Sequence, residues 1–290
     1  LMNKKKISQK FILGSAQLGS RYGIKKKFKS REISNQIINR AKKKGINTLD
    51  LADSYSNSNN ILKKKLKNWK ICYKISQKTL LKNSKGNDFI KFFFKTLKSY
   101  NIESCEYFLF HNAYSLNTDP GKKVFEILNI LKKSGFVKKI GVSFYSPKEI
   151  INITKKFQID VVQIPVNIFD QRFLEQGLLK RIKRKNIEIH ARSIFLQGLL
   201  TYNYKNLPNK FKRFKKTFKK WDNFIEKNKS SAINESLQFI LNLNEVDKIV
   251  VGFDNPKQLS ELINCSNRKK STNYLKLKSK DLSLIDPRKW

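Results

Sequence analysis

The residue types that could do chemistry in this sequence gather at the ends of a few short apolar runs. Asp50 ends one run and Tyr55 follows it, Lys74 ends the next run, and His111 ends the one after that. If these runs are neighbouring parallel strands, their carboxyl ends lie side by side, at the edge where α/β proteins bind ligands. The four side chains would then meet in one pocket, where a carboxylate, a phenol, an ammonium and an imidazole can transfer protons.

The run that ends at Asp50 shows how the chain positions such residues. Gly45 is the residue type that most often follows the end of a helix, and the β-branched Ile46 and Thr48 favour a strand. Before Gly45, apolar residues recur at helical spacing, and Ser30 stands at the N-cap position. The sequence therefore predicts a helix over 30–44 and then a buried strand with Asp50 at its carboxyl end.

The same alternation continues along the chain. Short apolar runs predict strands at 10–14, 46–50, 69–74, 106–111, 139–143, 160–163, 187–193 and 248–252. Helical periodicity predicts helices at 30–44, 57–66, 88–100, 120–134, 147–157, 173–184, 231–241 and 256–263. The glycine-containing segment 15–23 is expected to be a loop that faces the ligand. The basic segment 202–229 does not fit the repeat, and it either covers the ligand or forms an external excursion.

About eight short, mainly apolar strands, each followed by a helix, indicate a parallel sheet buried on both faces. The predicted fold is an α/β (β/α)8 TIM barrel in a single domain over 1–290, with its core at about 11–263 and a basic C-terminal extension at 264–290. The alternative is a doubly wound open sheet. The glycines near residue 14 do not form the Gly-x-Gly-x-x-Gly pattern that a dinucleotide site in such a sheet requires.

The formal net charge of +40 raises the question of a nucleic-acid or membrane partner. Lysine far outnumbers arginine and is spread over nearly every predicted helix, whereas nucleic-acid sites concentrate basic residues on one face. We interpret the charge as a compositional bias, with lysine stems lying over apolar surface and their ammonium groups in water. No specific nucleic-acid partner is expected.

The cysteines and the apolar runs indicate the cellular compartment to expect. Cys72, Cys105 and Cys265 are an odd number at unrelated spacings, so neither a disulfide framework nor a metal site is predicted. No run has the length of a membrane span, and the first residues lack a signal-peptide core. The expectation is a cytoplasmic protein without a membrane partner.

Several motifs, in order along the chain, resemble the aldo-keto reductase family. They are Gly14-Ser-Ala-Gln-Leu-Gly19 with Tyr22-Gly23, Gly45-Ile-Asn-Thr-Leu-Asp50 with Tyr55, Lys74, Phe108-Leu-Phe-His111, Ile140-Gly-Val-Ser143, Val162-Gln163-Ile-Pro-Val-Asn167, Arg192-Ser-Ile-Phe-Leu-Gln197-Gly198, and Val251-Gly252-Phe-Asp-Asn255-Pro-Lys-Gln258. The resemblance covers residues 11 to about 263, nearly the whole chain, with one motif in each barrel unit.

The resemblance implies NAD(P)H-dependent reduction of a small-molecule aldehyde or ketone, a sugar-type carbonyl among the candidates. Asp50, Tyr55, Lys74 and His111 would be the catalytic tetrad. Tyr55 would give the proton, and the Lys74 ammonium, held charged by Asp50, would lower the pKa of the tyrosine. His111 would orient the carbonyl by hydrogen-bonding its oxygen.

The resemblance also assigns cofactor contacts, with NADPH favoured and NADH as the alternative. Ser143, Gln163 and Asn167 would lie around the nicotinamide, Ser193, Leu196 and Gly198 along the pyrophosphate, and Gly252, Asn255 and Gln258 near the adenosine. Family members that prefer NADPH carry a basic residue just after the glycine that corresponds to Gly252. Here Phe253 and Asp254 follow it, and Lys257 could substitute.

The chain departs from the family pattern at three places. Ser56 and Asn59 replace the usual Gly and Glu after the catalytic tyrosine, which touches loop geometry. Phe144 replaces an Asn after the fifth strand, and Arg192 replaces an aromatic residue that often stacks on the nicotinamide. These two departures concern nicotinamide binding.

Other functions remain open at this stage. The same barrel could serve as a cofactor-binding sensor or partner subunit with negligible turnover. Lys74 could be the nucleophile of a Schiff-base aldolase, although Asp50 would keep it charged and therefore unreactive. The sequence does not name the substrate or the oligomeric state.

Overall fold

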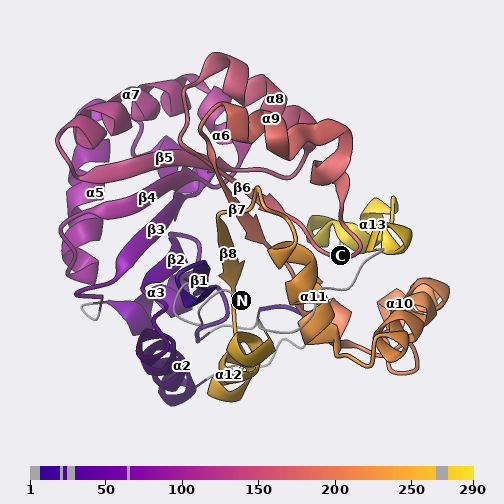
Figure 1. Ribbon diagram of the computed structural model, residues 1–290. Helices are drawn as coiled ribbons and strands as arrows, with labels where there is room; N and C mark the ends of the chain where they lie inside the picture. Colours follow the sequence, from indigo (N-terminus) through magenta and orange to yellow (C-terminus); the bar gives the residue numbers. More distant parts are fainter. Residues whose placement is uncertain (1–6, 20–21, 25–29, 64–65, 266–273) are drawn as a thin grey trace.

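Eight parallel strands close into a barrel in chain order (Figure 1). The computed structural model describes residues 7–19, 22–24, 30–63, 66–265 and 274–290. The strands are β1 (Phe11–Gly14), β2 (Thr48–Ala52), β3 (Lys70–Ile75), β4 (Cys105–Phe110), β5 (Val137–Ser143), β6 (Val161–Pro165), β7 (Glu188–Arg192) and β8 (Lys248–Val251). Because β1 pairs with both β2 and β8, the predicted barrel is confirmed and the open sheet is wrong.

Helices surround the barrel and shield its strands (Figure 1). They are α2 (Arg31–Lys43), α3 (Ser56–Leu62), α4 (Gln77–Lys82), α5 (Gly86–Tyr100), α6 (Ala113–Asn117), α7 (Asp119–Lys133), α8 (Pro147–Lys156), α9 (Leu178–Arg184), α11 (Ala232–Leu241) and α12 (Pro256–Cys265). Each turns an apolar stripe inward; α5, for example, buries Phe89, Phe93 and Leu97. This burial is the main source of helix stability in such a fold.

The segment around Asp50 folds for the reasons visible in the sequence. The Ser30 side chain caps α2 by accepting a hydrogen bond from the Ile33 amide, and Gly45 follows the helix with a φ of +82°. One detail differs from the prediction: β2 continues to Ala52, so Asp50 lies in the middle of the strand. Continued pairing of β2 with β3 extends the strand beyond the aspartate.

Two predicted helices are shorter than expected. The helix predicted over 57–66 is α3, which ends at Leu62. The helix predicted over 173–184 is divided into a 3₁₀ turn, Arg172–Gly177, and α9. Gln176 and Gly177 have left-handed backbone conformations, with φ values of +51° and +64°, and a left-handed residue ends a helix.

The basic segment that follows β7 lies outside the barrel. It contains a 3₁₀ turn, Asn209–Phe214, and α10 (Lys215–Lys227), which Figure 1 shows at the edge of the molecule. The buried Trp221 ring lies against Phe169, and its Nε1 donates to the Leu200 carbonyl at 3.0 Å. Segment 202–229 was predicted either to cover the ligand or to form an external excursion, and this arrangement favours the external excursion.

The C-terminal residues pack back onto the barrel. The Tyr274 ring contacts Phe224 of α10 and Phe239 of α11, and its hydroxyl lies 3.1 Å from a Glu235 carboxylate oxygen. A short helix, α13 (Leu282–Ile285), follows, and then a 3₁₀ turn, Pro287–Lys289. The end of the chain therefore contributes to the packing of the fold.

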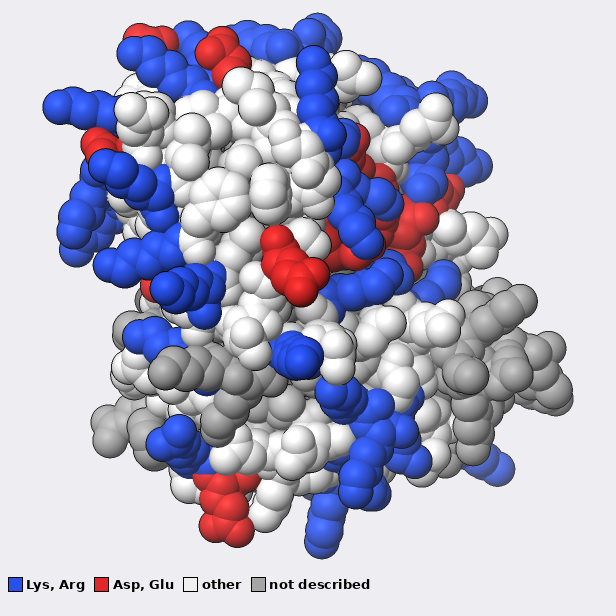
Figure 2. Space-filling view, turned by 90° about the vertical axis from the view of Figure 1, so that its left-hand side faces the viewer, with Lys and Arg blue, Asp and Glu red and all other residues white. Residues whose placement is uncertain are grey.

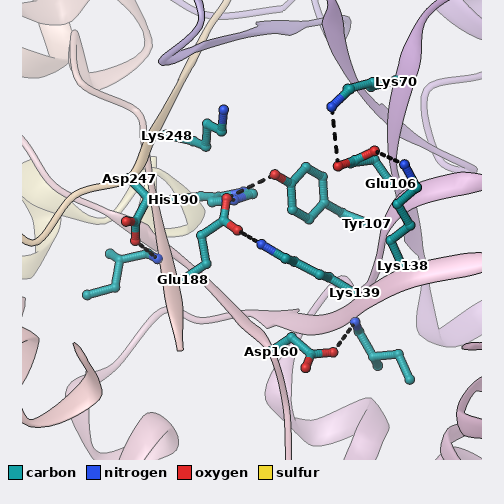
Figure 3. Close-up of polar contacts among 12 residues, drawn as sticks. Lys70, Glu106, Tyr107, Lys138, Lys139, Asp160, Glu188, His190, Asp247 and Lys248 are labelled. Atoms are coloured by element: carbon teal, nitrogen blue, oxygen red, sulfur yellow. Dashed lines mark hydrogen bonds and ion pairs between the residues drawn. The ribbon is translucent and has the colours of Figure 1, made fainter. Parts of the chain in front are cut away.

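The amino-terminal end of the barrel holds a network of charged and polar side chains (Figure 3). Glu188 accepts a hydrogen bond from the Tyr107 hydroxyl at 2.9 Å, lies 2.9 Å from His190 Nε2, and pairs with Lys139. His190 is completely buried and its ring meets that of Tyr107 edge-on. His190 therefore packs inside the barrel.

The surface carries lysine and arginine in many places. On the face drawn in Figure 2, these side chains are spread out, with acidic and uncharged areas between them. None of the described helices combines the length and the apolar character that a membrane crossing requires.

Candidate active site

A cavity of about 340 Å³ opens at the carboxyl ends of the strands. Residues from the ends of β1, β2, β3, β5, β7 and β8 and from the loops that follow them line it. Asp50, Tyr55, Lys74 and His111 are all among the lining residues. The four residues that the sequence placed at successive strand ends therefore share one cavity.

Strand register brings Asp50 and Lys74 together. Lys74 pairs in register with Ala52, two residues after Asp50, and residues two apart on a strand face the same side. Lys74 Nζ lies 2.7 Å from Asp50 Oδ1, and the residues are only 3% and 2% exposed. Burial alone would lower the pKa of Lys74, but the Asp50 carboxylate, with smaller contributions from Tyr55 and Cys72, raises it overall. Lys74 is therefore a charged ammonium at neutral pH.

Gln163 completes this buried pair. Its Nε2 donates to Asp50 Oδ2 at 3.0 Å, and its Oε1 accepts from Lys74 Nζ at 3.2 Å. Gln163 is fully buried and is not part of the cavity lining. Gln163 thus holds the carboxylate and the ammonium in one fixed geometry, and its contact with the nicotinamide stays a prediction.

Tyr55 and His111 stand next to the pair. Lys74 Nζ lies 5.6 Å from the centre of the Tyr55 ring, and the Tyr55 and His111 rings meet edge-on with 6.1 Å between centroids. Burial raises the pKa of Tyr55 to about 12, although the Lys74 charge acts in the opposite direction. Lys74 therefore acts in the expected direction, but the cost of burying a phenolate exceeds the stabilisation by the ammonium, so the pKa stays above that of a free tyrosine.

His111 is neutral in this environment. Burial, and then the positive charge of Lys74, lower the pKa of His111 to about 3. A neutral imidazole carries one N–H donor and one acceptor nitrogen, so it can hydrogen-bond a carbonyl oxygen without contributing charge. The site thus combines a protonated phenol, an ammonium and an uncharged imidazole.

The other predicted cofactor residues divide into two groups. Those that line the cavity are Ser143, Ser193, Gly198, Gly252 and Gln258. Those outside the lining have structural hydrogen bonds or packing: Asn167 Nδ2 donates to the Ser193 carbonyl at 3.2 Å, Leu196 is buried, and Asn255 Oδ1 accepts from the Gln258 amide at 3.0 Å. The residues of the second group hold the shape of the loops on which residues of the first group lie.

The loop after β7 has an unusual backbone. Ser193, Leu196, Gln197 and Gly198 all have left-handed conformations, with φ values between +48° and +88°. Non-glycine residues with left-handed backbone angles store strain, which persists chiefly at functional sites. Left-handed turns can direct successive N–H groups to one side, which makes a concave site for an anion. A Cβ on Gly198 would meet no atom within 4 Å, so this stretch of the lining is open.

The departures from the family pattern have structural explanations. Asn59 Nδ2 donates to the Ala52 carbonyl at 2.9 Å and so fastens the loop that carries Tyr55. Phe144 is fully buried, and its carbonyl accepts a hydrogen bond from Arg192 Nη2 at 3.0 Å. Arg192 lines the cavity, with its guanidinium 4.3 Å from the centre of the Tyr145 ring.

Sequence reasoning missed some lining residues. Tyr145, Gln17 and Asp254 line the cavity, and Gln17 Nε2 donates to Asp254 Oδ1 at 3.0 Å across the β1 and β8 loops. They lie in loops, which lack the periodic pattern that identifies strands and helices. Only their position just after strand ends could have indicated them. Among the described residues, no cluster of His, Cys, Asp and Glu could hold a metal ion.

Comparisons with known proteins agree with this geometry. The family model for the aldo/keto reductase family matches residues 10–279. A search of curated proteins gave no match.

Solved structures share the fold at low sequence identity. The holo form of aldo-keto reductase AKR11C1 from Bacillus halodurans has a TM-score of 0.72 and 16% identity, covering 97% of this chain and 95% of that one. Glycerol dehydrogenase AKR11B4 from Gluconobacter oxydans has a TM-score of 0.68 and 18% identity, covering 96% and 92%. The thermostable aldo-keto reductase Tm1743, in complex with the inhibitor epalrestat, has a TM-score of 0.68 and 19% identity, covering 92% and 93%.

Proposed function

Because this chain belongs to the aldo/keto reductase family of NAD(P)H-dependent oxidoreductases, we propose that it reduces an aldehyde or ketone to the alcohol with Tyr55 as the proton donor. One observation carries the assignment of roles: the buried Lys74–Asp50 pair lies next to Tyr55, and His111 lines the same cavity.

Each residue of the tetrad has a separate task in this proposal. Tyr55, whose pKa is about 12, is protonated at neutral pH and can protonate the developing alkoxide. The Lys74 ammonium stabilises the phenolate that remains, and Asp50 keeps Lys74 charged. Neutral His111 donates a hydrogen bond to the carbonyl oxygen and orients it. When bound, the reduced nicotinamide supplies the hydride.

The residues present fit a nicotinamide cofactor. The strained 193–198 loop, with the open position at Gly198, supports binding of the pyrophosphate there. Gly252 and Gln258 line the cavity toward the start of α12, whose N-terminus favours an anionic group. Ser143, Asn167, Leu196 and Asn255 remain candidates for contacting the cofactor or shaping its site.

The structure offers arguments for either form of the cofactor. Lys257 is exposed in the first turn of α12 and could bind the 2′-phosphate of NADPH. Asp254 lines the cavity nearby, and a carboxylate in this region favours the free ribose hydroxyls of NADH. We retain NADPH as the proposed cofactor and NADH as the alternative.

The charge state of Lys74 argues against a Schiff-base aldolase. Such an enzyme needs a neutral lysine as its nucleophile, whereas Asp50 raises the pKa of Lys74. Trapping with borohydride in the presence of a keto substrate should therefore give no covalent adduct.

The direct test is titration with NADPH and NADH, followed by a carbonyl panel. Protein fluorescence should report binding of at least one cofactor, and the bound cofactor should be oxidised when a suitable carbonyl is added. The panel should include glyceraldehyde, since one structural neighbour is a glycerol dehydrogenase. Tight binding without oxidation by any member would favour the sensor or partner-subunit function instead.

A further inference from the structure

Arg192, the last residue of β7, brings a positive charge to the cavity. Its side chain is half-buried and lines the cavity together with Tyr55 and His111. The charge of Arg192 also lowers the pKa of His111, although burial, Lys74 and Asp50 have larger effects on it.

The guanidinium is held in one orientation. It lies 4.3 Å from the centre of the Tyr145 ring, Nη2 donates to the Phe144 carbonyl at 3.0 Å, and Nη1 donates to Ser193 Oγ at 3.4 Å. Each Nη atom carries a second N–H group that remains available. A planar group fixed in this way loses little conformational entropy when it binds a ligand.

In the described part of the chain, no carboxylate balances this charge. Among the described residues, no carboxylate forms an ion pair with Arg192, and the undescribed segments contain no Asp or Glu. Of the two carboxylates that line the cavity, Asp50 pairs with Lys74 and Asp254 accepts from Gln17. A partly buried cation without a partner is unfavourable, and an anionic ligand would relieve this cost.

The basic composition of the chain does not account for Arg192. Lys74 and Arg192 are the only Lys or Arg residues among the described residues of the cavity lining. Arginine also differs from the lysines that dominate the surface, because its planar fork matches a carboxylate with two parallel hydrogen bonds.

We infer that Arg192 binds a carboxylate group of the carbonyl substrate, so that the enzyme reduces oxo acids in preference to uncharged aldehydes and ketones. The inference rests on the proposed carbonyl reduction and specifies its substrate class. His111 and Tyr55 bind the carbonyl oxygen at one end of the substrate, and Arg192 binds the anionic group at the other. Two anchoring points fix the direction in which the carbonyl faces the hydride donor.

The kinetic test compares an anionic substrate with an uncharged one that differs from it by a methyl ester at the far end. These are 4-formylbenzoate and its methyl ester, which carry the same aldehyde on the same ring. The wild type should reduce the acid with a kcat/KM about 10- to 100-fold higher, as expected for hydrogen bonds to a charged group. Arg192→Gln should bring this ratio close to one, chiefly through KM for the acid, and Arg192→Lys should retain part of it.

Arg288→Gln is the matched control. Arg288 lies 4.0 Å from the centre of the same Tyr145 ring, but it pairs with Asp286 and does not line the cavity. Its removal should leave the acid-to-ester ratio at the wild-type value. A similar loss of ratio in both variants would mean that packing around Tyr145, and not the charge of Arg192, decides specificity.

Two further outcomes would overturn the inference. If Arg192→Gln weakens NADPH binding tenfold and leaves the acid-to-ester ratio unchanged, the guanidinium binds a cofactor phosphate. If the variant slows the acid and the ester equally, Arg192 acts through His111. Glyceraldehyde 3-phosphate compared with glyceraldehyde separates a general anion site from one that prefers carboxylates.

A binding experiment keeps the inference separate from the proposed function. Calorimetry should show that 4-(hydroxymethyl)benzoate, with and without NADPH, binds the wild type more tightly than its methyl ester and loses this advantage in Arg192→Gln. If no carbonyl is reduced but this difference persists, the reductase function fails and the anion site stands. If carbonyls are reduced but the acid binds no more tightly than its ester, the reductase function stands and the anion site fails.

Discussion

Lys74 Nζ lies 2.7 Å from Asp50 Oδ1 inside the barrel, and Gln163 hydrogen-bonds to both residues. An ammonium in an apolar interior would lose its proton without such a partner. The pair therefore maintains a fixed positive charge next to Tyr55, at the end of the barrel where the cavity opens. This relationship is the basis of the first two predictions.

Asp50→Asn should destabilise the fold and impair the reaction together. The substitution leaves Lys74 buried without its carboxylate, and breaking a buried ion pair in this way costs about 3–5 kcal/mol. Urea unfolding should show the loss of stability, and kcat should fall because Lys74 becomes neutral. Asp119→Asn, which removes an exposed pair with Lys122, is the control and should change neither quantity appreciably. Full activity in Asp50→Asn would contradict the assigned role.

Tyr55→Phe should abolish proton transfer while preserving packing. The ring remains, so NADPH should bind nearly as before, and carbonyl reduction should slow by about 100- to 10,000-fold. Lys74→Met should slow it comparably, and the double variant should be little worse than either single variant because the two residues act as a unit. Single-turnover kinetics measure these rates. Losses that multiply in the double variant would show that Lys74 does not work through Tyr55.

The rate of reduction should change little with pH in the neutral range. Tyr55, with a pKa of about 12, stays protonated, and His111, with a pKa of about 3, stays neutral. The profile of kcat/KM should therefore be level from about pH 5 to pH 9 as far as these two groups determine it. A fall in kcat/KM centred near pH 6.5 that disappears in His111→Gln would show that His111 titrates normally.

The same histidine should make stability depend on pH. The folded pKa of His111 is about 3, below the unfolded value of about 6.5, so the unfolded state binds a proton first as pH falls. Its contribution is fully present above pH 6.5 and is lost progressively toward pH 3. Urea unfolding of wild type and His111→Gln at pH 7 and pH 4 should show a smaller decrease for the variant. Equal decreases would place the acid sensitivity elsewhere.

His190 is expected to affect stability and not turnover. It lies at the amino-terminal end of the barrel with Glu188 and Tyr107, away from the cavity lining (Figure 3). His190→Ala should leave a cavity and unpaired polar groups, which typically costs about 2–4 kcal/mol. His111→Ala should instead reduce turnover with little change in cofactor affinity. The opposite pattern would exchange the roles of the two histidines.

Binding to duplex DNA should be weak and independent of sequence. The net charge of +40 attracts polyanions, but the lysines are dispersed over the face in Figure 2. Electrophoretic shifts seen at about 50 mM salt should nearly vanish at about 200 mM, as expected for counterion release. A sequence-selective complex that survives the higher salt would indicate a dedicated nucleic-acid site.

The sequence determined the barrel because its signals are local. Gly45 ends a helix, short apolar runs form strands, and their alternation specifies a parallel closed sheet with strand ends at one edge. The same logic placed Asp50, Lys74 and His111 at neighbouring strand ends. It misjudged the end of β2 by two residues, since pairing with β3, and not local preference, decides where the strand stops.

Only the tertiary structure decided how these side chains affect one another. The net effect on the pKa of Tyr55 depends on burial from all sides, which no neighbour in sequence reveals. Gln163, 89 residues from Lys74 in the chain, lies against it because closure of the barrel brings side chains of β3 and β6 into one interior. Arg192 has no signature in sequence beyond a departure from the family pattern, and its place beside Tyr145 depends on a loop that follows a different strand. Side-chain surroundings are set by closure of the barrel, whereas strands and helices are set largely by residues close in sequence.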